Sequence, residues 1–351
     1  MSGGVDSSTA ACLLKEAGYD LIGVTLKLFP GGDTEKSACR LSDDVEDART
    51  VARRLDIPHY VFNGTDCFRN QVMEPFAASY CRGETPNPCI DCNRHLKFGA
   101  LLQHVQELSQ EKLATGHYVR LSFDAGADRW LLHKAVHREK DQSYVLYCLT
   151  QDQLSHSLFP LGKLSKEEVR IIAGDRGLVN ARKRESQDIC FVPDGDYAAF
   201  IRRHTGQSFP AGPFLDEEGH ILGTHQGIIG YTVGQRRGLG VSSNHGRLYV
   251  KEVRPADNAV VLSENKALYT RSLTTRSLNL IACRQLSAPV RLAARIRYRM
   301  TEQPCTAEQT GPDTLRIDFD QPQRAVTPGQ AVVLYDGDTV VGGGVIEKGD
   351  T

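Results

Sequence analysis

The sequence predicts an α/β protein: a doubly wound parallel sheet, then a small mixed or β central domain, then a C-terminal β-barrel. Strand-like and helix-like segments alternate up to about residue 196, as they do in doubly wound sheets. Glycine-rich, β-prone segments replace them after that point, as in small barrels. A chain of 351 residues has room for three domains, which we place at 1–196, 197–268 and 269–351.

Apolar periodicity and terminal signals locate the elements of the first domain. Helices are expected at 7–17, 42–58, 67–80 and about 97–109, and the capping-box spacing of "SKEE" at 165–168 begins another. A parallel strand buried on both faces is expected at 20–29, and further strands are expected at 59–62 and 112–115. The segment "TPNPCIDCN" (85–93) should be extended, because proline lacks an N–H donor and biases its predecessor away from helix.

The second half begins with one helix-like stretch at 197–204, and the β-prone segments follow it. Residues 247–264 predict a hairpin with its turn at 256–258. Further strands are expected in "RLAARIRYRM", "TLRIDF", "AVVLYDG" and "VVGGGVIE". In the first of these, Arg295, Arg297 and Arg299 should share one strand face, which suits either phosphate and base contact or a solvated barrel surface.

The composition is that of a soluble globular protein without a global charge. The formal net charge is −1, so only a local basic face, such as the run at 181–185, could attract nucleic acid. Ten cysteines are too scattered in a chain of this size for a disulfide framework. No apolar run has membrane-spanning length and no signal peptide precedes the first motif, so we expect a reducing, cytoplasmic setting.

The strongest functional signal is "MSGGVDSS" at residues 1–8. Its glycines let backbone N–H groups converge on an anion, and the helix that begins near Ser7 directs its positive dipole there. The Gly-Lys-Ser/Thr ending of a Walker A loop is missing. The candidate nucleotide-binding residues are Ser2, Gly3, Gly4, Val5, Asp6, Ser7 and Ser8, with Asp6 either orienting the loop or helping to hold Mg²⁺. The alternative is a glycine-rich turn that only caps a helix.

Eight motifs occur in order along essentially the whole chain: "SGGVDSS" (2–8), "TPNPCIDCN" (85–93), "ATGHYVR" (114–120), "KDQSYVLY" (140–147), "ESQDICF" (185–191), "TVGQRRGLG" (232–240), "RIRYRM" (295–300) and "TPGQAVVLYDGD" (327–338). Together they resemble the tRNA-specific 2-thiouridylase family. The resemblance implies an ATP pyrophosphatase with an adenine nucleotide α-hydrolase-like PP-loop domain. In such an enzyme ATP, with Mg²⁺, adenylates the C2 oxygen of the wobble uridine of tRNA. A protein-bound sulfur then displaces AMP.

The resemblance also implies partners and individual roles. The partners are the tRNA anticodon loop and a sulfur donor protein, such as a cysteine desulfurase or a sulfur relay. Cys92 matches the sulfur nucleophile and Cys190 the persulfide carrier, while Gly116 and the backbone of Leu28 match adenylate contacts. The residues that match tRNA or target-base contacts are Asn87, Pro88, Cys89, His117, Lys140, Asp141, Gln142, Arg297, Tyr298 and Gln330. Such a loop normally follows a buried strand, and this chain starts at Met1, which implies either a start misassigned at an internal methionine or a truncation, with the central strand of the sheet missing.

Without the resemblance, several of these residues have plainer interpretations. Cys190, between Ile189 and Phe191, could equally be a buried apolar residue, and Cys12 and Cys148 are expected in the core. Gly116 and His117 could form a plain turn after a strand, in which the histidine makes only structural hydrogen bonds. The polar run from residue 140 could be an exposed loop.

Cys89 is the residue at which this sequence departs from the family, because many relatives carry aspartate there. Cys89, Cys92 and Cys190 could supply three thiolates to a [4Fe–4S] cluster with one iron left to bind sulfide. The alternative is a persulfide on Cys190 followed by a Cys92–Cys190 disulfide that a reductant resets. The third thiolate favours the cluster.

Two other function classes remain open at the level of sequence. One is a related amidotransferase or ligase that uses the same ATP chemistry on another acceptor, although no N-terminal cysteine or glutaminase-like segment provides ammonia. The other is a non-enzymatic RNA-binding protein with a zinc-stapled loop. A single C-x-x-C supplies only two of the four ligands that structural zinc takes.

Overall fold

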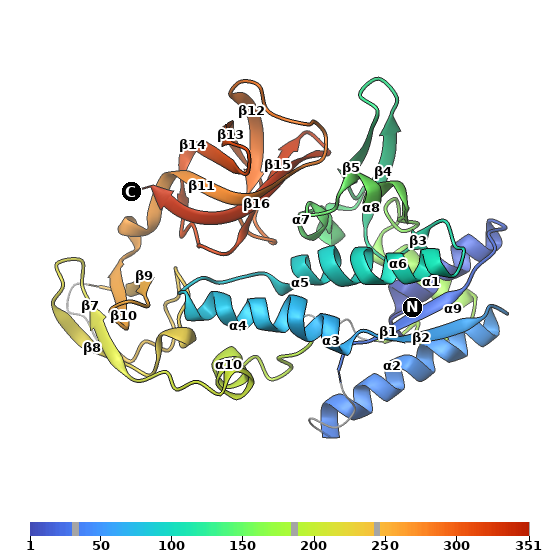
Figure 1. Ribbon diagram of the computed structural model, residues 1–351, viewed down its shortest axis with the longest axis horizontal. Coiled ribbons are helices and arrows are strands. Elements are labelled where there is room, and N and C mark those ends of the chain that lie inside the picture. The colour runs from blue at the N-terminus through green and yellow to red at the C-terminus, as the bar shows by residue number, and fades with distance from the viewer. Residues whose placement is uncertain (30–34, 184–188, 242–245, 351) are drawn as a thin grey trace. The chain divides into compact units, whose positions relative to one another are not determined.

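The computed structural model describes residues 1–29, 35–183, 189–241 and 246–350 (Figure 1). The chain forms two compact units. Unit 1 comprises Met1–Val72, Cys89–Gln187 and Asp338–Val340, and unit 2 comprises Met73–Pro88, Asp188–Gly337 and Val341–Thr351. Parts of the predicted basic run at 181–185 and of the motif at 185–191 lie outside the described residues.

Unit 1 is built on short parallel strands, as the sequence predicts. Strand β1 (Gly23–Lys27) pairs with β2 (His59–Asn63), and β3 (Leu113–Ala114) pairs with β6 (Ser157–Leu158). Helices α1 (Val5–Glu16) and α9 (Lys166–Asp175) pack against each other beside β1 (Figure 1). Their buried faces share one core, whose members include Val5, Ala10, Tyr118, Val169 and Ala173. This core fixes where α1 begins, and therefore where its N-terminus points.

The predicted helix at 42–58 is α2 (Glu35–Arg54), which begins seven residues earlier than predicted. The sequence suggested Ser42 or Asp43 as the cap, but the helix continues through this acidic stretch. The predicted helix at 67–80 corresponds to α3 (Thr65–Phe68), a π-helical turn (Arg69–Met73) and α4 (Glu74–Cys81). The serine of "SKEE" caps α9 with both hydrogen bonds of a capping box, so that prediction is confirmed.

The extended conformation predicted for residues 85–93 is wrong in its second half. Helix α5 (Pro88–Asp91) begins at the second proline, and a π-helix (Cys92–Ala100) and α6 (Leu101–Glu107) continue it. Proline is tolerated at the first helical position, because the N–H that it lacks would have no partner inside the helix. The remaining elements of unit 1 are the hairpin β4 (Val119–Asp124) and β5 (Arg129–Lys134), a 3₁₀ turn (Arg138–Lys140), α7 (Ser143–Leu146) and α8 (Gln151–Ser155). No pattern singled out the hairpin.

The central part of unit 2 is a small sheet of four strands in the order β8-β7-β10-β9. Helix α10 (Tyr197–Thr205) precedes β7 (Gly212–Leu215) and β8 (Ile221–His225), and a 3₁₀ turn follows (Ile228–Gly230). The predicted hairpin is confirmed as β9 (Leu248–Arg254) and β10 (Ala259–Glu264). Its turn contains Asn258 at φ 47°, a left-handed conformation that asparagine tolerates.

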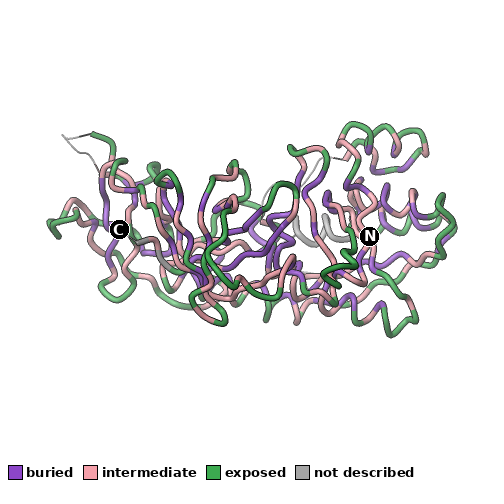
Figure 2. Tube along the Cα trace, turned by 90° about the horizontal axis from the view of Figure 1, so that it is seen from above, coloured by how far each residue is buried: buried purple, intermediate pink, exposed green. Residues whose placement is uncertain are grey.

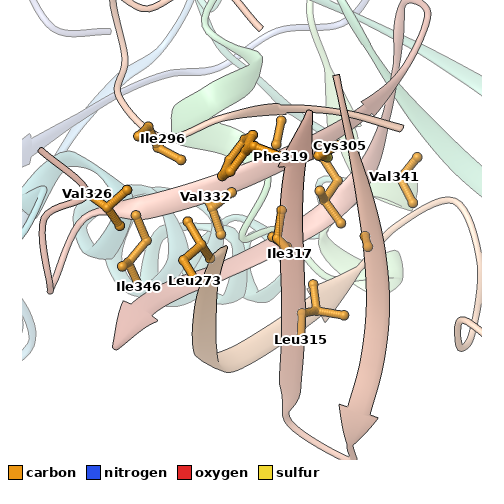
Figure 3. Packing of buried hydrophobic residues seen from close by; sticks show 13 residues of the cluster. Leu273, Ile296, Cys305, Leu315, Ile317, Phe319, Val326, Val332, Val341 and Ile346 are labelled. Carbon is orange, nitrogen blue, oxygen red and sulfur yellow. The ribbon is translucent and has the colours of Figure 1, made fainter. Parts of the chain in front are cut away.

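The last part of unit 2 is a six-stranded barrel with the order β11-β14-β13-β12-β15-β16, closed by the pairing of β11 with β16. A 3₁₀ turn (Asn265–Leu268) leads into it, and its strands are β11 (Tyr269–Leu280), β12 (Val290–Arg295), β13 (Gln303–Gly311), β14 (Thr314–Arg324), β15 (Ala331–Asp336) and β16 (Thr339–Asp350). Apolar side chains such as Leu273, Ile317 and Val332 gather inside it (Figure 3). The barrel confirms the predicted C-terminal fold.

Burial alternates along β13 and β14, where the buried members include Cys305, Ala307, Leu315, Ile317 and Phe319, whereas β15 is buried throughout Ala331–Tyr335. Figure 2 shows buried and exposed stretches interleaved along the chain. The predicted arginine face is wrong, because β12 ends at Arg295 and a turn carries Arg297 and Arg299. Among the described residues, no helix combines the length and apolar character needed to cross a bilayer.

Candidate active site

The glycine-rich loop before α1 has the geometry of an anion-binding site. Gly4 is extended at the N-cap (φ −88°, ψ 158°), and no described side chain caps the helix there. The first-turn N–H groups are thus available to an anion, together with the positive end of the helix dipole. Gly3 has φ +68°, and a Cβ atom on it would lie 2.3 Å from the carbonyl oxygen of Asp44. Only glycine fits there.

Serine hydroxyls and one asparagine hold this loop in shape. Ser7 Oγ accepts from the Ser2 N–H at 3.1 Å, and Ser8 Oγ donates to the Gly4 carbonyl at 3.0 Å. The buried Asn180 donates from Nδ2 to the Gly3 carbonyl at 3.1 Å and to Ser8 Oγ at 2.8 Å. Its Oδ1 atom is buried without a hydrogen-bond partner among the described residues. An orphaned acceptor beside a phosphate loop is what water on a nucleotide-bound Mg²⁺ would satisfy, so the residues fit Mg-ATP.

The carboxylate of Asp6 is engaged by residues from two other elements. Lys166 Nζ donates to both carboxylate oxygens at 2.7 and 2.8 Å, and the Tyr118 hydroxyl donates to one of them at 2.7 Å. Lys166 is 13% exposed and Asp6 31%. Of the two roles suggested for Asp6, these contacts support orientation of the loop.

The other predicted nucleotide contacts lie at the carboxyl ends of strands, where ligands bind in such sheets. Leu28 follows β1, and Gly116 follows β3. A Cβ atom on Gly116 would lie 2.7 Å from the Asp6 carbonyl carbon and from the Ser7 nitrogen, so this turn packs directly on the phosphate loop. The structure therefore brings Gly116 and the loop together.

His117 is buried between Phe98 and Phe159, and its Nδ1 atom lies 2.9 Å from Thr115 Oγ1. Burial and then the charge of Lys97 hold the pKa of His117 well below its ordinary value. The imidazole is therefore neutral at pH 7. A neutral, aromatic-lined ring can stack on or hydrogen-bond to a base but carries no charge to a phosphate.

The two cysteines of "CIDC" lie at the start of a helical segment that its neighbours anchor. Asn93 Nδ2 donates to the Val145 carbonyl at 3.0 Å, and Cys148 Sγ donates to the Ile90 carbonyl at 3.6 Å. Cys148 is buried, as predicted, and so is Cys12. Cys92 is half-buried and Cys89 is exposed. Cys92 thus sits on a fixed backbone beside open surface.

The electrostatics around Cys92 keep it a thiol at rest. Burial raises its pKa, the Lys97 charge opposes this, and charges on Cys89, Asp91 and Cys67 would raise it further. Desolvation by the residues around its sulfur likewise raises the pKa of Cys89, although the residue reaches the surface, and the charge of Lys97 again opposes the rise. Burial also raises the pKa of Asp91 to about 6. The thiolate, which is the nucleophilic form, is therefore the minor form of Cys92 near pH 7.

Alkylation of Cys92 by iodoacetamide should rise about tenfold per pH unit from pH 7 to 9, since the thiolate fraction grows tenfold per unit below the pKa. Lys97→Met should slow the reaction at every pH in this range, because removing the positive charge raises the pKa further. Peptide mass spectrometry measures the rate, and Lys163→Met at an exposed site is the control. A rate that levels off below pH 8 would contradict the raised pKa.

Cys190 belongs to unit 2 and is exposed, so its plainer interpretation as a buried apolar residue is wrong. Its neighbour Phe191 packs against Phe76 and Phe200, with ring centroids 5.1 and 5.0 Å apart. This aromatic cluster anchors the chain next to Cys190 and leaves the cysteine at the surface.

The predicted tRNA contacts are divided between the units. Unit 1 holds Cys89, His117, Lys140, Asp141 and Gln142, whereas unit 2 holds Asn87, Pro88, Arg297, Tyr298 and Gln330. Asp141 is only 4% exposed, and its carboxylate accepts from the Ser143 hydroxyl and the Ala135 N–H. The run from residue 140 is thus not simply an exposed loop. Pro88 is buried and Tyr298 is exposed.

Sequence reasoning missed several residues that shape the site. They are Cys67, Lys97, Tyr118, Lys166, Asn180 and Lys183, the last of which bonds Asp44 and Asp47 at 2.6 and 2.5 Å. The sequence did contain one signal for Lys166. A lysine at the first position of a helix is unfavourable for the helix dipole, which indicates that its charge has a partner elsewhere.

Three family models match the chain in order. The tRNA methyl transferase HUP domain matches residues 1–194, the tRNA methyl transferase PRC-barrel domain residues 198–264, and the aminomethyltransferase β-barrel domain residues 270–346. One solved structure, the U34-tRNA thiolase NcsA from Methanococcus maripaludis with its [4Fe–4S] cluster, is 18% identical with a TM-score of 0.35. The match covers 58% of this chain and 64% of that one, a likeness too weak to bear on the site.

Curated relatives match over the full length. The tRNA-specific 2-thiouridylase MnmA of Moorella thermoacetica is 51% identical over 353 residues, which is 99% of this chain and 98% of the relative. The enzyme of the same name from Clostridioides difficile is 46% identical over 351 residues, covering 99% and 97%. The chain therefore belongs to the tRNA-specific 2-thiouridylase family of sulfurtransferases.

Proposed function

We propose that this protein uses ATP to replace the C2 oxygen of the wobble uridine of tRNA by sulfur. The observation that carries the proposal is that a single folded unit contains both a phosphate loop with an uncapped helix N-terminus and the half-buried Cys92. Neither a ligase without sulfur chemistry nor a zinc-stapled RNA-binding protein accounts for both. The activity for which the full-length relatives are named supports the same assignment.

The first step is adenylation. The C2 oxygen of uridine attacks the α-phosphate of ATP, and pyrophosphate leaves with the electron pair of the broken P–O bond. An amide-like oxygen leaves poorly, and adenylation converts it into the good leaving group AMP. The N–H groups of Gly4 and of the first turn of α1 would receive the charge that develops on pyrophosphate. Gly116 and Leu28 would place the adenylate, and Asp6 would keep the loop in register.

The second step transfers sulfur. The exposed Cys190 can be loaded as a persulfide by a donor protein such as a desulfurase, and its terminal sulfur attacks C2 as AMP leaves. The Cys92 thiolate then attacks Cys190, which breaks the S–S bond, leaves sulfur on the uridine and forms a Cys92–Cys190 disulfide. A thiol reductant supplies the two electrons that reset it. The buried thiol of Cys92 must first lose its proton.

The thiols of Cys89, Cys92 and Cys190 are the ligands that a [4Fe–4S] cluster would take, and such a cluster would supply an open iron for sulfide. Among the described residues of unit 1, the sulfur atoms of Cys67, Cys89 and Cys92 do not lie close enough to one another to share a metal ion. The exposure of Cys190 supports the persulfide route, although the sequence favoured the cluster.

Cys89→Asp separates the two routes. The persulfide route predicts activity within about threefold of the unchanged protein, because Cys89 makes no bond in it. Protein purified without oxygen is assayed for iron, sulfide, visible absorbance and 2-thiouridine formation. Parallel loss of iron and of activity in the variant would contradict the persulfide route and establish the cluster.

Mass spectrometry of tRNA tests the function itself. Purified protein, tRNA, ATP and a persulfide donor should produce 2-thiouridine at the wobble position, with one AMP released per sulfur. Unchanged tRNA with ATP consumed would point to another acceptor. We place the reaction in the cytoplasm, where thiols stay reduced, consistent with the nine described cysteines being free of disulfide bonds.

A further inference from the structure

The segment Gly83–Thr85, which leads into the helical segment of Cys89 and Cys92, is bonded to the barrel of unit 2. The Thr85 N–H donates to the Pro328 carbonyl at 2.8 Å, and Gln330 Nε2 donates to the Thr85 carbonyl at 2.6 Å. Gly329, at φ +87°, allows this approach, because a Cβ atom on it would lie 2.9 Å from the Thr85 nitrogen. Both polar groups of the Thr85 backbone are therefore bound to one barrel loop.

A side-chain ion pair reinforces these backbone contacts. Arg276 on β11 donates from Nη2 to both carboxylate oxygens of Glu84, at 3.0 and 3.1 Å, and Arg82 donates to one of them at 2.8 Å. The Glu84 side chain is 14% exposed and that of Arg276 31%. An acid this deeply covered needs its cationic partner, so Arg276 holds Glu84 in place.

The central sheet region of unit 2 covers the other side of the segment. Thr85 Oγ1 donates to Thr232 Oγ1 at 3.2 Å, and a Cβ atom on Gly83 would lie 3.1 Å from the Val253 carbonyl oxygen. Next to these contacts is a cavity of about 260 Å³, lined by Thr85, Thr232, Val233, Gly234, Gln235, Arg297, Thr327 and Gln330. Gln330, predicted only as a tRNA contact, thus also bonds the chain that leads to the cysteines.

We propose that Arg276 and Gln330 are positioning residues for sulfur transfer, because they fix the chain that leads into the helical segment of Cys92. Thr85 precedes Cys92 by seven residues, so a base held at Glu84 and Thr85 limits where the nucleophile can go. Misplacing a reacting atom by about 1 Å can cost about a hundredfold in rate. The inference rests on the proposed thiolation and gives the barrel a part in the reaction besides contact with tRNA.

The test compares Arg276→Met with Arg291→Met in the full-length protein. Arg291 lies on the same barrel and pairs with Asp320 at 2.7 Å through a bidentate contact that involves no atom of residues 83–85. Arg276→Met should lower kcat for 2-thiouridine formation about tenfold and leave the KM for tRNA within twofold, whereas Arg291→Met should change neither. Glu84→Gln should reproduce the loss, and the double variant should be no worse than either single one.

Equal kcat values for the two arginine variants would overturn the inference, and so would a loss confined to KM. If Arg276→Met does not fold, Gln330→Glu is the second test variant. It keeps the shape of the side chain but replaces the donor that bonds the Thr85 carbonyl by an acceptor. Its readout needs no tRNA: the alkylation rate of Cys92 should change at least threefold, and an unchanged rate refutes the inference. If the unchanged protein forms no 2-thiouridine, the proposed function fails instead, and the alkylation rates still report on the loop.

Discussion

Replacing Cys92 by serine is expected to lower the rate of 2-thiouridine formation more than about a thousandfold. Serine keeps the size of the side chain, so the helical segment anchored through Asn93 should remain intact. Its hydroxyl is a far weaker nucleophile than a thiolate and cannot complete the disulfide. The measurement is 2-thiouridine per tRNA by mass spectrometry, next to the affinity for ATP and for tRNA, both of which should stay within about threefold.

A matched control is Cys67→Ser. Cys67 lies in the same unit, is also half-buried, and is close enough for its charge to act on Cys92. It makes no bond in the proposed reaction, so its variant should retain activity within about threefold. Full activity of Cys92→Ser, or an equal loss in both variants, would rule out Cys92 as the sulfur-handling residue.

Cys190→Ser should match the loss in Cys92→Ser, and the double variant should be no slower than either one. Residues that act as a unit in one reaction lose their effect together, so their single effects do not add. Additive losses would mean that the two cysteines work independently, against a shared persulfide and disulfide.

The parts of the fold that the sequence predicted are those with local causes. The capping box at Ser165, the hairpin turn at Asn258 and the barrel strands each follow from side chains a few residues apart. The π-helical stretch at Cys92–Ala100 and the early start of α2 do not, because they depend on how a helix packs against distant elements. The second proline of "TPNP" was misjudged because its position in the helix, and not its identity, decides its effect.

In the candidate site, too, features with local causes could be predicted from the sequence, and features that depend on distant residues could not. The phosphate loop is recognisable because glycines, serines and a helix start follow one another within eight residues. The residues that hold this loop in place cannot be found from local sequence patterns, because Lys166 is 160 residues from Asp6 and Asn180 is 177 residues from Gly3. Only the folded chain brings those side chains together. The motif therefore identified where the anion binds, and the structure adds what holds that place rigid.

Lys166→Met is expected to weaken ATP binding by about one to two orders of magnitude and to lower the free energy of unfolding by about 2 kcal/mol. Removing one partner of a buried ion pair costs about 3–5 kcal/mol, and the 31% exposure of Asp6 reduces that cost because water can solvate its carboxylate. Asp6 lies in the first turn of α1, so its displacement would move the N–H groups that receive the phosphates. Calorimetry with a non-hydrolysable ATP analogue and urea unfolding measure the two effects.

Two variants separate orientation of the loop from simple loss of charge. Tyr118→Phe removes one hydrogen bond to Asp6 but keeps the ion pair, so its loss in ATP affinity should be clearly smaller than that of Lys166→Met. Asp6→Asn combined with Lys166→Met removes the uncompensated charge and should regain part of the stability without regaining ATP affinity. Lys163→Met, on the exposed turn before α9, controls for the loss of one lysine. If Lys166→Met binds the analogue as tightly as the Lys163 variant, the Asp6–Lys166 pair does not shape the phosphate loop.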